Sequence, residues 1–246
     1  MSCKTMLTLQ EVVAYYKNTN DPDKHKVLYE TFERLASSYK DGLLANHSSE
    51  VEGFGELSFH WNWYLLVNIM PADFKFLEIG VYKGRVLSLI QMLSDTLGKR
   101  ARIWGVTPLE NAGDKFSRYK PSNYLDDIKT AYANSRASME FTTIVKGYSQ
   151  EPAIVQLVGE SGLYDIIFID VCHDYPVVCQ DIDNYAPMLK RGGFLVLDDA
   201  SSLVPGSYGR FLGHADVGKA VQDKLDGNKE FVHLYAVGHN RVWLKV

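Results

Sequence analysis

Residues 164–174, YDIIFIDVCHD, join an apolar run to polar side chains that can carry out chemistry. The run at 166–169 is continuously apolar, which is typical of a strand that a parallel sheet buries on both faces. Asp170, His173 and Asp174 follow it within five positions. The segment therefore predicts a core strand that ends at one wall of a functional site.

Residues 192–199, GGFLVLDD, have the same pattern. Their apolar part, 194–197, leads directly into Asp198 and Asp199. Ligands of open parallel sheets bind beyond the carboxyl ends of the strands. Two strands that end in acids therefore predict two walls of one site.

Strand-like and helical segments alternate along the chain from residue 71 onward. The expected strands are 74–80, 102–107, 140–147, 164–170, 192–199, 231–238 and 240–246, and the expected helices between them are 84–98, 122–134, 150–160, 176–190 and 214–225. Repeated strand–helix units predict a parallel sheet with helices on both faces, and the short connector between the last two strands predicts an antiparallel hairpin. We expect an α/β fold with a Rossmann-like, mostly parallel, seven-stranded sheet.

The first part of the chain, residues 1–70, has helical periodicity and is expected to form a helical extension or cap before the Rossmann-like domain at 71–246. Asp21 or Asp23 is positioned to begin its second helix. Residues 46–55, NHSSEVEGFG, are polar and contain glycine, so they are expected to form a loop. Pro71 ends the last apolar helix of this part.

The composition is that of a soluble globular protein. The chain has 246 residues, 46% of them hydrophobic, and a net charge of −4 without a long basic run, which argues against nucleic acid as a partner. Residues 1–18, MSCKTMLTLQEVVAYYKN, lack the continuous apolar core of a signal peptide, so we expect none, and no apolar segment is long enough to span a membrane. Three cysteines without close pairing, Cys3, Cys172 and Cys179, favour a reducing, cytoplasmic setting. The sequence allows a homo-oligomer but does not indicate one.

The first expected strand leads into FLEIGVYKGRV, with Glu78, Gly80 and Gly84. A dinucleotide fingerprint would have a further glycine between the last two, and here it is missing. Gly80 would let a ligand approach the backbone closely, and Glu78 would supply an acid for a cationic group. An ordinary strand-to-helix turn explains the same glycines.

The next two strands end in polar residues at the same expected edge of the sheet. The second ends in Thr107, where a ribose-binding acid is usual, and Glu110 follows three residues later. Either side chain could contact a ribose. Ser149 and Gln150 follow the third strand, and Ser149 could equally cap the next helix.

These segments together resemble a known family. FLEIGVYKG, KGYSQEP, YDIIFIDVCHDY and LKRGGFLVLDDAS, in this order, are similar to class I S-adenosylmethionine-dependent methyltransferases. The likeness is greatest to the metal-dependent O-methyltransferases of the catechol and the macrolide-sugar or antibiotic-tailoring types. It covers residues 70–246 and is least specific in the first segment.

The resemblance implies a role for each matching residue. Glu78, Gly80 and Gly84 would face the methionine end of S-adenosylmethionine, and Ser149 and Gln150 would line its adenine. Thr107 and Asp170 complete the expected cofactor contacts, although Thr107 departs from the family's ribose-binding acid. Asp170, Asp198 and Asp199 match the metal ligands, and His173 matches the general base, which is histidine in the sugar enzymes and lysine in the catechol enzymes.

The chemistry of these side chains agrees with that expectation. Three converging carboxylates repel one another unless a cation neutralises them, and an all-oxygen ligand set suits Mg²⁺ or another hard divalent cation. Such an ion lowers the pKa of a bound hydroxyl, and a histidine that titrates near neutral pH can take its proton. The alternative for any single acid is that it caps a turn.

We therefore expect a Mg²⁺-dependent O-methyltransferase that acts on a hydroxyl of a sugar or another polyhydroxylated small molecule. A nicotinamide-dependent oxidoreductase and a non-catalytic cofactor-binding protein are the alternatives. The polar loop at 111–124 is either a lid over the site or a plain surface loop.

The remaining histidines and a cluster of tryptophans are expected to be structural. His60, His214, His233 and His239 are each assigned a structural or solvated role. Trp63 is expected in the core, whereas Trp61 could pack there or cover the site.

Overall fold

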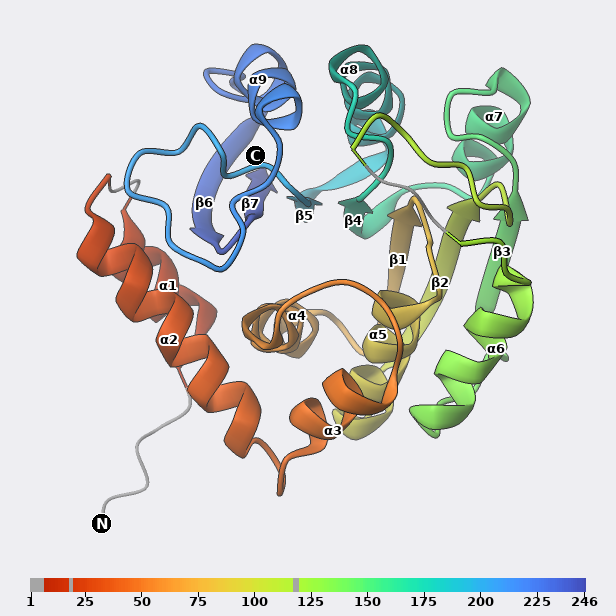
Figure 1. Cartoon of the computed structure of the whole chain (residues 1–246), viewed down its shortest axis with the longest axis horizontal. Helices are drawn as coiled ribbons and strands as arrows, with labels where there is room; N and C mark the ends of the chain where they lie inside the picture. Colours follow the sequence, from red (N-terminus) through yellow and green to blue (C-terminus); the bar gives the residue numbers. More distant parts are fainter. Residues whose placement is uncertain (1–6, 18–19, 117–119) are drawn as a thin grey trace.

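The apolar runs of the sequence become the central strands of a seven-stranded sheet in the computed structural model, which describes residues 7–17, 20–116 and 120–246 (Figure 1). The strands are β1 (Asp73–Ile79), β2 (Arg100–Thr107), β3 (Thr142–Lys146), β4 (Tyr164–Ile169), β5 (Leu189–Leu197), β6 (Phe231–Val237) and β7 (Asn240–Lys245). Their order is β3-β2-β1-β4-β5-β7-β6. The first five are parallel, and β7 runs antiparallel to both neighbours. The predicted Rossmann-like fold is confirmed.

Strand register brings the polar residues of three strands to one edge of the sheet. Ile79 of β1 is level with Ile169 of β4, and Ile169 is level with Leu197 of β5. The ladder continues past the strand ends, because the backbone N–H of Asp170 donates to Ile79 (2.8 Å) and that of Asp198 donates to Ile169 (3.0 Å). Gly80, Asp170 and Asp198 consequently lie side by side.

Helices cover both faces of the sheet (Figure 1). One face carries α4 (Leu57–Ile69), α5 (Arg85–Thr96) and α6 (Tyr124–Asn134), and the other carries α7 (Pro152–Glu160), α8 (Tyr175–Tyr185) and α9 (Ala215–Lys224). Successive strand residues point to opposite faces, so the core has two halves. Phe76 and Phe168 belong to the first half, and Leu77 and Ile167 belong to the second.

The N-terminal part contributes α1 (Leu9–Tyr16), α2 (Pro22–Ser38) and α3 (Leu43–Glu50) in addition to α4. Asp21 caps α2 by accepting from the backbone N–H of Asp23 (3.0 Å), which settles its start. Residues 57–69 form a core helix rather than a peripheral one, since the ring of Trp63 packs edge-on against Phe168 at 5.0 Å. Trp61 is also buried and stacks on Tyr64 at 4.5 Å, so it belongs to the core.

Two expected element boundaries were wrong. Residues 46–50 of the expected loop belong to α3, because the buried His47 bonds to His60 and Ser88, and these tertiary contacts override the polar composition. The expected helix at 176–190 ends at Tyr185, a short 3₁₀ turn covers Ala186–Met188, and β5 begins at Leu189. Pro187 explains that early end, because it has no backbone N–H to donate to the carbonyl of Asp183 four residues earlier.

No helix in residues 7–17, 20–116 and 120–246 is long and apolar enough to cross a membrane. Cys172 and Cys179 are free thiols, and Cys3 lies outside the described residues.

Candidate active site

A cavity of about 490 Å³ opens at the carboxyl edge of the sheet, where the strand register gathers the polar residues. Its volume lies within the range of small-molecule sites. Nine residues given a possible site role from the sequence line it: Gly80, Thr107, Glu110, Ser149, Gln150, Asp170, His173, Asp198 and Asp199. It is also lined by Asp114, His214 and His239.

The two glycines of the first turn are both constrained by packing, and Gly80 also lines the cavity. Gly80 has a φ of +98°, and a Cβ there would overlap the backbone carbonyl of Asp170. The glycine is therefore required by the packing of β1 against the end of β4, in addition to lining the cavity. Gly84 begins α5 with a φ of +77° and packs against Ile128 of α6, where a Cβ would come within 3.1 Å of the Ile128 Cα.

Glu78 lies on β1, two residues before Gly80; it is 4% exposed and is not among the residues that line the cavity. Its Oε2 is buried and has no hydrogen-bond partner within the described part of the chain. Burial, together with the charge of Asp198, raises the pKa of Glu78 to about 8. An unpaired acid of this kind would be satisfied by a cationic group at the cavity floor.

The acids that end β4 and β5 form one cluster of negative charge. Burial and then the charges of Asp198, Asp199 and Glu78 raise the pKa of Asp170 well above its usual range. His239, in the turn between β6 and β7, adds an imidazole to this cluster. Its Nε2 lies 3.2 Å from Asp198 Oδ1 and 3.8 Å from Asp199 Oδ1. Burial lowers the pKa of His239, but the charges of Asp198 and Asp199 outweigh burial and raise it to about 9.

The donor atoms at this edge suit a divalent cation. Asp198, Asp199 and His239 offer ligand atoms that all lie within 4.8 Å of one another, and so do His173, Asp199 and His214. Asp170 is close enough to Asp198 for their charges to interact. Carboxylate oxygens and imidazole nitrogens are ordinary ligands of divalent metals.

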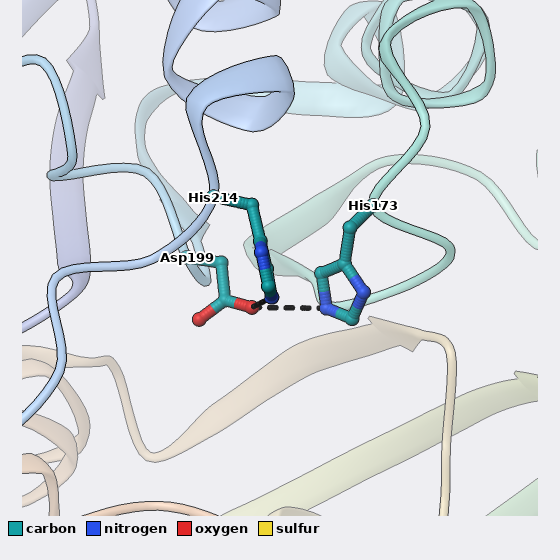
Figure 2. A group of neighbouring side chains, drawn as sticks. All are labelled: His173, Asp199 and His214. Carbon is teal, nitrogen blue, oxygen red and sulfur yellow. Dashed lines mark ion pairs between the residues drawn. The ribbon is translucent and has the colours of Figure 1, made fainter. Parts of the chain in front are cut away.

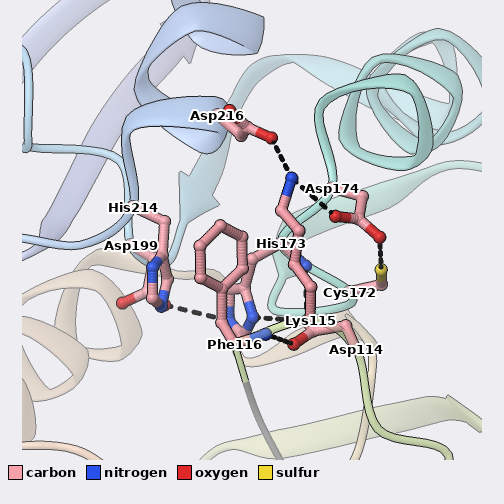
Figure 3. Close-up of polar contacts among 9 residues, drawn as sticks. All are labelled: Asp114, Lys115, Phe116, Cys172, His173, Asp174, Asp199, His214 and Asp216. Carbon is pink, nitrogen blue, oxygen red and sulfur yellow. Dashed lines mark hydrogen bonds and ion pairs between the residues drawn. The ribbon is translucent and has the colours of Figure 1, made fainter.

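His173 lies between two carboxylates, Asp199 (Figure 2) and Asp114 (Figure 3). Its Nε2 lies 2.9 Å from Asp199 Oδ2, and its Nδ1 lies 2.6 Å from Asp114 Oδ2. Asp114 Oδ2 also accepts from the backbone N–H of His173 at 2.8 Å, so both the ring and its backbone are held. Burial opposes the charged imidazole, but the bonds and charges of Asp199 and Asp114 outweigh it and raise the pKa of His173.

The segment that carries Asp114 folds over the site (Figure 3). Lys115 bridges Asp174 (2.9 Å) and Asp216 (2.6 Å), which lie at the N-terminal ends of α8 and α9. The ring of Phe116 packs on His214 at 4.3 Å, and His214 packs on His173 at 4.5 Å. Residues 117–119 of the expected lid lie outside the described residues.

The other end of the cavity lies above β2 and β3. Gln150 donates to both carboxylate oxygens of Asp181, at 2.8 and 3.0 Å, and also to Ser149. Burial raises the pKa of Asp181 to about 6, although side-chain hydrogen bonds from Gln150 and Ser149 to Asp181 lower it. Glu110 accepts from the Tyr148 hydroxyl at 2.5 Å, and both residues line the cavity.

Thr107 and Glu110, the two candidates for the ribose contact, both line the cavity. The hydroxyl oxygen of Thr107 already accepts from the backbone N–H of Leu109 at 3.1 Å.

Three residues of this edge were missed in the sequence. His214 and His239 were assigned structural or solvated roles, and Asp114 was seen only as part of a polar loop. Only weak local signals mark them, namely a histidine at each of two turns and an acid in a long loop beside the sheet.

Comparisons with known proteins agree with this fold. The Rossmann-like architecture is that of solved class I methyltransferases. A family model described as "Methyltransferase domain" matches residues 77–200, which is half of the chain, so the chain belongs to the methyltransferase-domain family.

An uncharacterised protein of Acanthamoeba polyphaga mimivirus is 28% identical over 148 residues, or 58% of this chain. The chain's match spans 60% of the length of that relative.

Two solved structures have the same fold at low identity. CalS11, a TDP-rhamnose 3'-O-methyltransferase of calicheamicin biosynthesis, is 16% identical with a TM-score of 0.53, over 92% of this chain and 95% of its own. MycE, a methyltransferase of mycinamycin biosynthesis in complex with Mg and SAH, is 16% identical with a TM-score of 0.51, over 82% of this chain and 53% of its own.

Proposed function

We propose that this protein is an S-adenosylmethionine-dependent, Mg²⁺-dependent O-methyltransferase that acts on a hydroxyl of a sugar or another polyhydroxylated small molecule. The observation that carries the proposal is the position of His173, whose Nε2 lies 2.9 Å from an acid of the cluster at the ends of β4 and β5. A proton acceptor and a metal-binding group are thus neighbours in one cavity, as a metal-assisted transfer to a hydroxyl requires.

The cavity has features that suit S-adenosylmethionine. Buried Glu78, with its unpaired Oε2, fits beneath the cationic methionine end of the cofactor. Ser149 and Gln150 lie at the opposite end, where the adenine is expected, and Thr107 and Glu110 lie between them. This order follows the strand order β1, β2, β3 and agrees with ligand binding at the carboxyl ends of parallel strands.

Asp170, Asp198 and Asp199 are proposed as the carboxylate ligands of the metal. When bound, a divalent ion would neutralise these acids and lower the pKa of a hydroxyl that it coordinates. Burial, and then the charges of Asp198, Asp199 and Glu78, raise the pKa of Asp170, and a bound cation would favour its charged form.

His173 is proposed as the general base. Asp114 holds Nδ1, so the ring presents Nε2 to the cavity. His173 Nε2 would accept the proton of the acceptor hydroxyl, and a bound S-adenosylmethionine would supply the methyl group to the acceptor oxygen. An acceptor hydroxyl bound at this position would hydrogen-bond to Nε2 in place of Asp199.

The acceptor is proposed to enter beside the aromatic rim of the cavity. Phe211 lines it and packs edge-on against His214 at 5.2 Å, and His214 packs in turn on the ring of the proposed base, His173, at 4.5 Å. CalS11 and MycE are tailoring enzymes of calicheamicin and mycinamycin biosynthesis, which supports a small glycosylated or polyhydroxylated acceptor.

A thermal-shift screen followed by a transfer assay tests the proposal. S-adenosylmethionine, but not NAD, should raise the melting temperature, and methyl transfer from labelled cofactor to a panel of sugars and glycosides should require a divalent ion. Stabilisation by NAD alone would favour the nicotinamide-dependent oxidoreductase. Binding of S-adenosylmethionine without transfer to any acceptor in the panel would favour a non-catalytic cofactor-binding protein.

A further inference from the structure

We propose that His239 is a direct ligand of the metal, so that an imidazole joins the carboxylates and the site prefers Mn²⁺ to Mg²⁺. The inference rests on the proposed function, because it concerns the same metal site. It goes beyond the all-oxygen ligand set expected from the sequence.

The positions of the ligand atoms carry the inference. Two ligands at right angles around an ion, each at about 2.1–2.3 Å, lie about 3.0–3.2 Å apart. His239 Nε2 is 3.2 Å from Asp198 Oδ1, which matches this spacing. Its distance of 3.8 Å to Asp199 Oδ1 corresponds to a wider angle around the same ion. One ion can therefore bind all three atoms.

The ring of His239 is fixed in this position by its surroundings. The residue is 7% exposed, and its carbonyl accepts from the backbone N–H of Ala200 at 2.8 Å, which ties the β6–β7 turn to the end of β5. Phe59 contacts the ring edge-on at 4.5 Å, and Phe211 does so at 5.5 Å. Nε2 faces the two carboxylates, whereas Nδ1 has no hydrogen-bond partner among the residues that the structure describes.

The second group of candidate ligands at this edge is less suited to the metal. It contains His173, Asp199 and His214. His173 is the proposed base, and Asp114 already holds its other nitrogen. His214 Nε2 lies 3.5 Å from Asp199 Oδ2. The ring of His214 packs on Phe116, which is not one of the residues that end β4 and β5. His239 is the histidine that faces both Asp198 and Asp199.

A nitrogen ligand changes which ions the site selects. Carboxylate oxygens suit Mg²⁺ and Mn²⁺, whereas imidazole favours transition metals over Mg²⁺. Affinity for Mn²⁺ should therefore exceed affinity for Mg²⁺. Replacing His239 should reduce the Mn²⁺ affinity by more than about tenfold and the Mg²⁺ affinity by less, since even the supporting groups of a metal site contribute about tenfold.

Direct observation of the bound ion tests the inference without an acceptor. The protein is loaded with Mn²⁺, its dissociation constants for Mn²⁺ and Mg²⁺ are measured by calorimetry, and nitrogen coupling to the ion is recorded by pulsed electron paramagnetic resonance. Wild-type protein containing histidine labelled with the heavy nitrogen isotope should show the corresponding change in coupling. His239→Ala and His239→Gln should lose the coupling, whereas the matched control His214→Ala should retain it.

Three results would overturn the inference. Bound Mn²⁺ without nitrogen coupling in the wild type would leave His239 only as a counter-ion of the acids. Coupling that persists in a folded His239→Gln variant and disappears in His214→Ala would assign the ligand to His214. If the folded wild type binds neither Mn²⁺ nor Mg²⁺, there is no metal site, and the metal dependence in the proposed function is also wrong.

Discussion

Asp114 Oδ2 lies 2.6 Å from His173 Nδ1 and accepts from the backbone N–H of His173 at 2.8 Å. One carboxylate oxygen thus holds both the ring and the backbone of the proposed base. Asp114 lies on the loop after β2, 59 positions before His173 in the sequence. The loop therefore lines the cavity and also holds the ring of the proposed base.

General-base catalysis contributes about 10²–10⁴-fold to kcat. We predict that Asp114→Asn loses part of this contribution. The amide can still accept from the backbone but no longer stabilises a charged imidazole. Its loss should also move the acidic limb of the kcat–pH profile to lower pH, because Asp114 helps to raise the pKa of His173. The KM for S-adenosylmethionine should change little.

The matched control for this variant is Lys115→Met, which breaks the ion pairs of the same loop with Asp174 and Asp216 but leaves Asp114 in place. An unchanged pH profile in Asp114→Asn would reduce Asp114 to a structural contact.

His173→Ala and Asp170→Asn should lose activity in different ways. His173→Ala removes the base and should cost about 10²–10⁴-fold in kcat at any Mg²⁺ concentration. Asp170→Asn weakens the metal site, so its activity should recover in part as Mg²⁺ is raised. Initial rates measured against Mg²⁺ concentration separate the two. Wild-type activity that survives EDTA would contradict the metal assignment.

Gly80→Ala should destabilise the fold by about 3 kcal/mol or more, because its Cβ would overlap the carbonyl of Asp170 at a positive φ. Gly98→Ala is the control, since Gly98 has a φ of +66° with no atom within 4 Å of the added Cβ. That change should cost only about 1–2 kcal/mol of backbone strain. Urea unfolding of both variants checks the difference, and equal losses would mean that the turn adapts.

Buried neutral histidines should make the protein sensitive to acid. Burial, followed by the charge of Arg85, lowers the pKa of His47 from 6.5 to about 3. Below pH 6.5 the unfolded chain binds a proton at this residue and the folded chain does not, so stability falls as the pH decreases from 6.5 towards 3. The expected slope is about 1.4 kcal/mol per pH unit.

The measurement for His47 is the difference in unfolding free energy between the wild type and His47→Gln across this range. The difference isolates His47 from Glu78. The pKa of Glu78 is raised to about 8, so Glu78 makes the unfolding free energy increase as the pH decreases, opposite to His47. Identical slopes in the two proteins would show that His47 is protonated in the fold.

The described part of the loop, residues 111–116 and 120–124, should gain protection from hydrogen exchange when cofactor and acceptor are both bound. Asp114, Lys115 and Phe116 contact groups of the site, so occupancy should stabilise the closed arrangement. Mass spectrometry of the exchange compares the free and bound forms. Equal protection in the two forms would make this segment a plain surface loop.

The sequence alone determined the sheet and the carboxyl-edge position of the acids. Apolar runs such as 166–169 identify buried strands from local composition, and the parallel arrangement then places the residues after each strand at one edge. Asp170 and Asp198 could be predicted there because their positions depend only on strand ends and register. The family resemblance added the identities of the cofactor and the metal as expectations.

Only the tertiary structure decided which distant side chains join them. Asp114 and His239 reach the cluster from a loop and a hairpin turn, and no local periodicity encodes such contacts. The same holds for Gly80, whose requirement comes from the backbone of Asp170, and for α3, whose polar helix is stabilised by burial of His47. Local patterns specify elements, whereas contacts between residues far apart in the chain depend on how those elements pack.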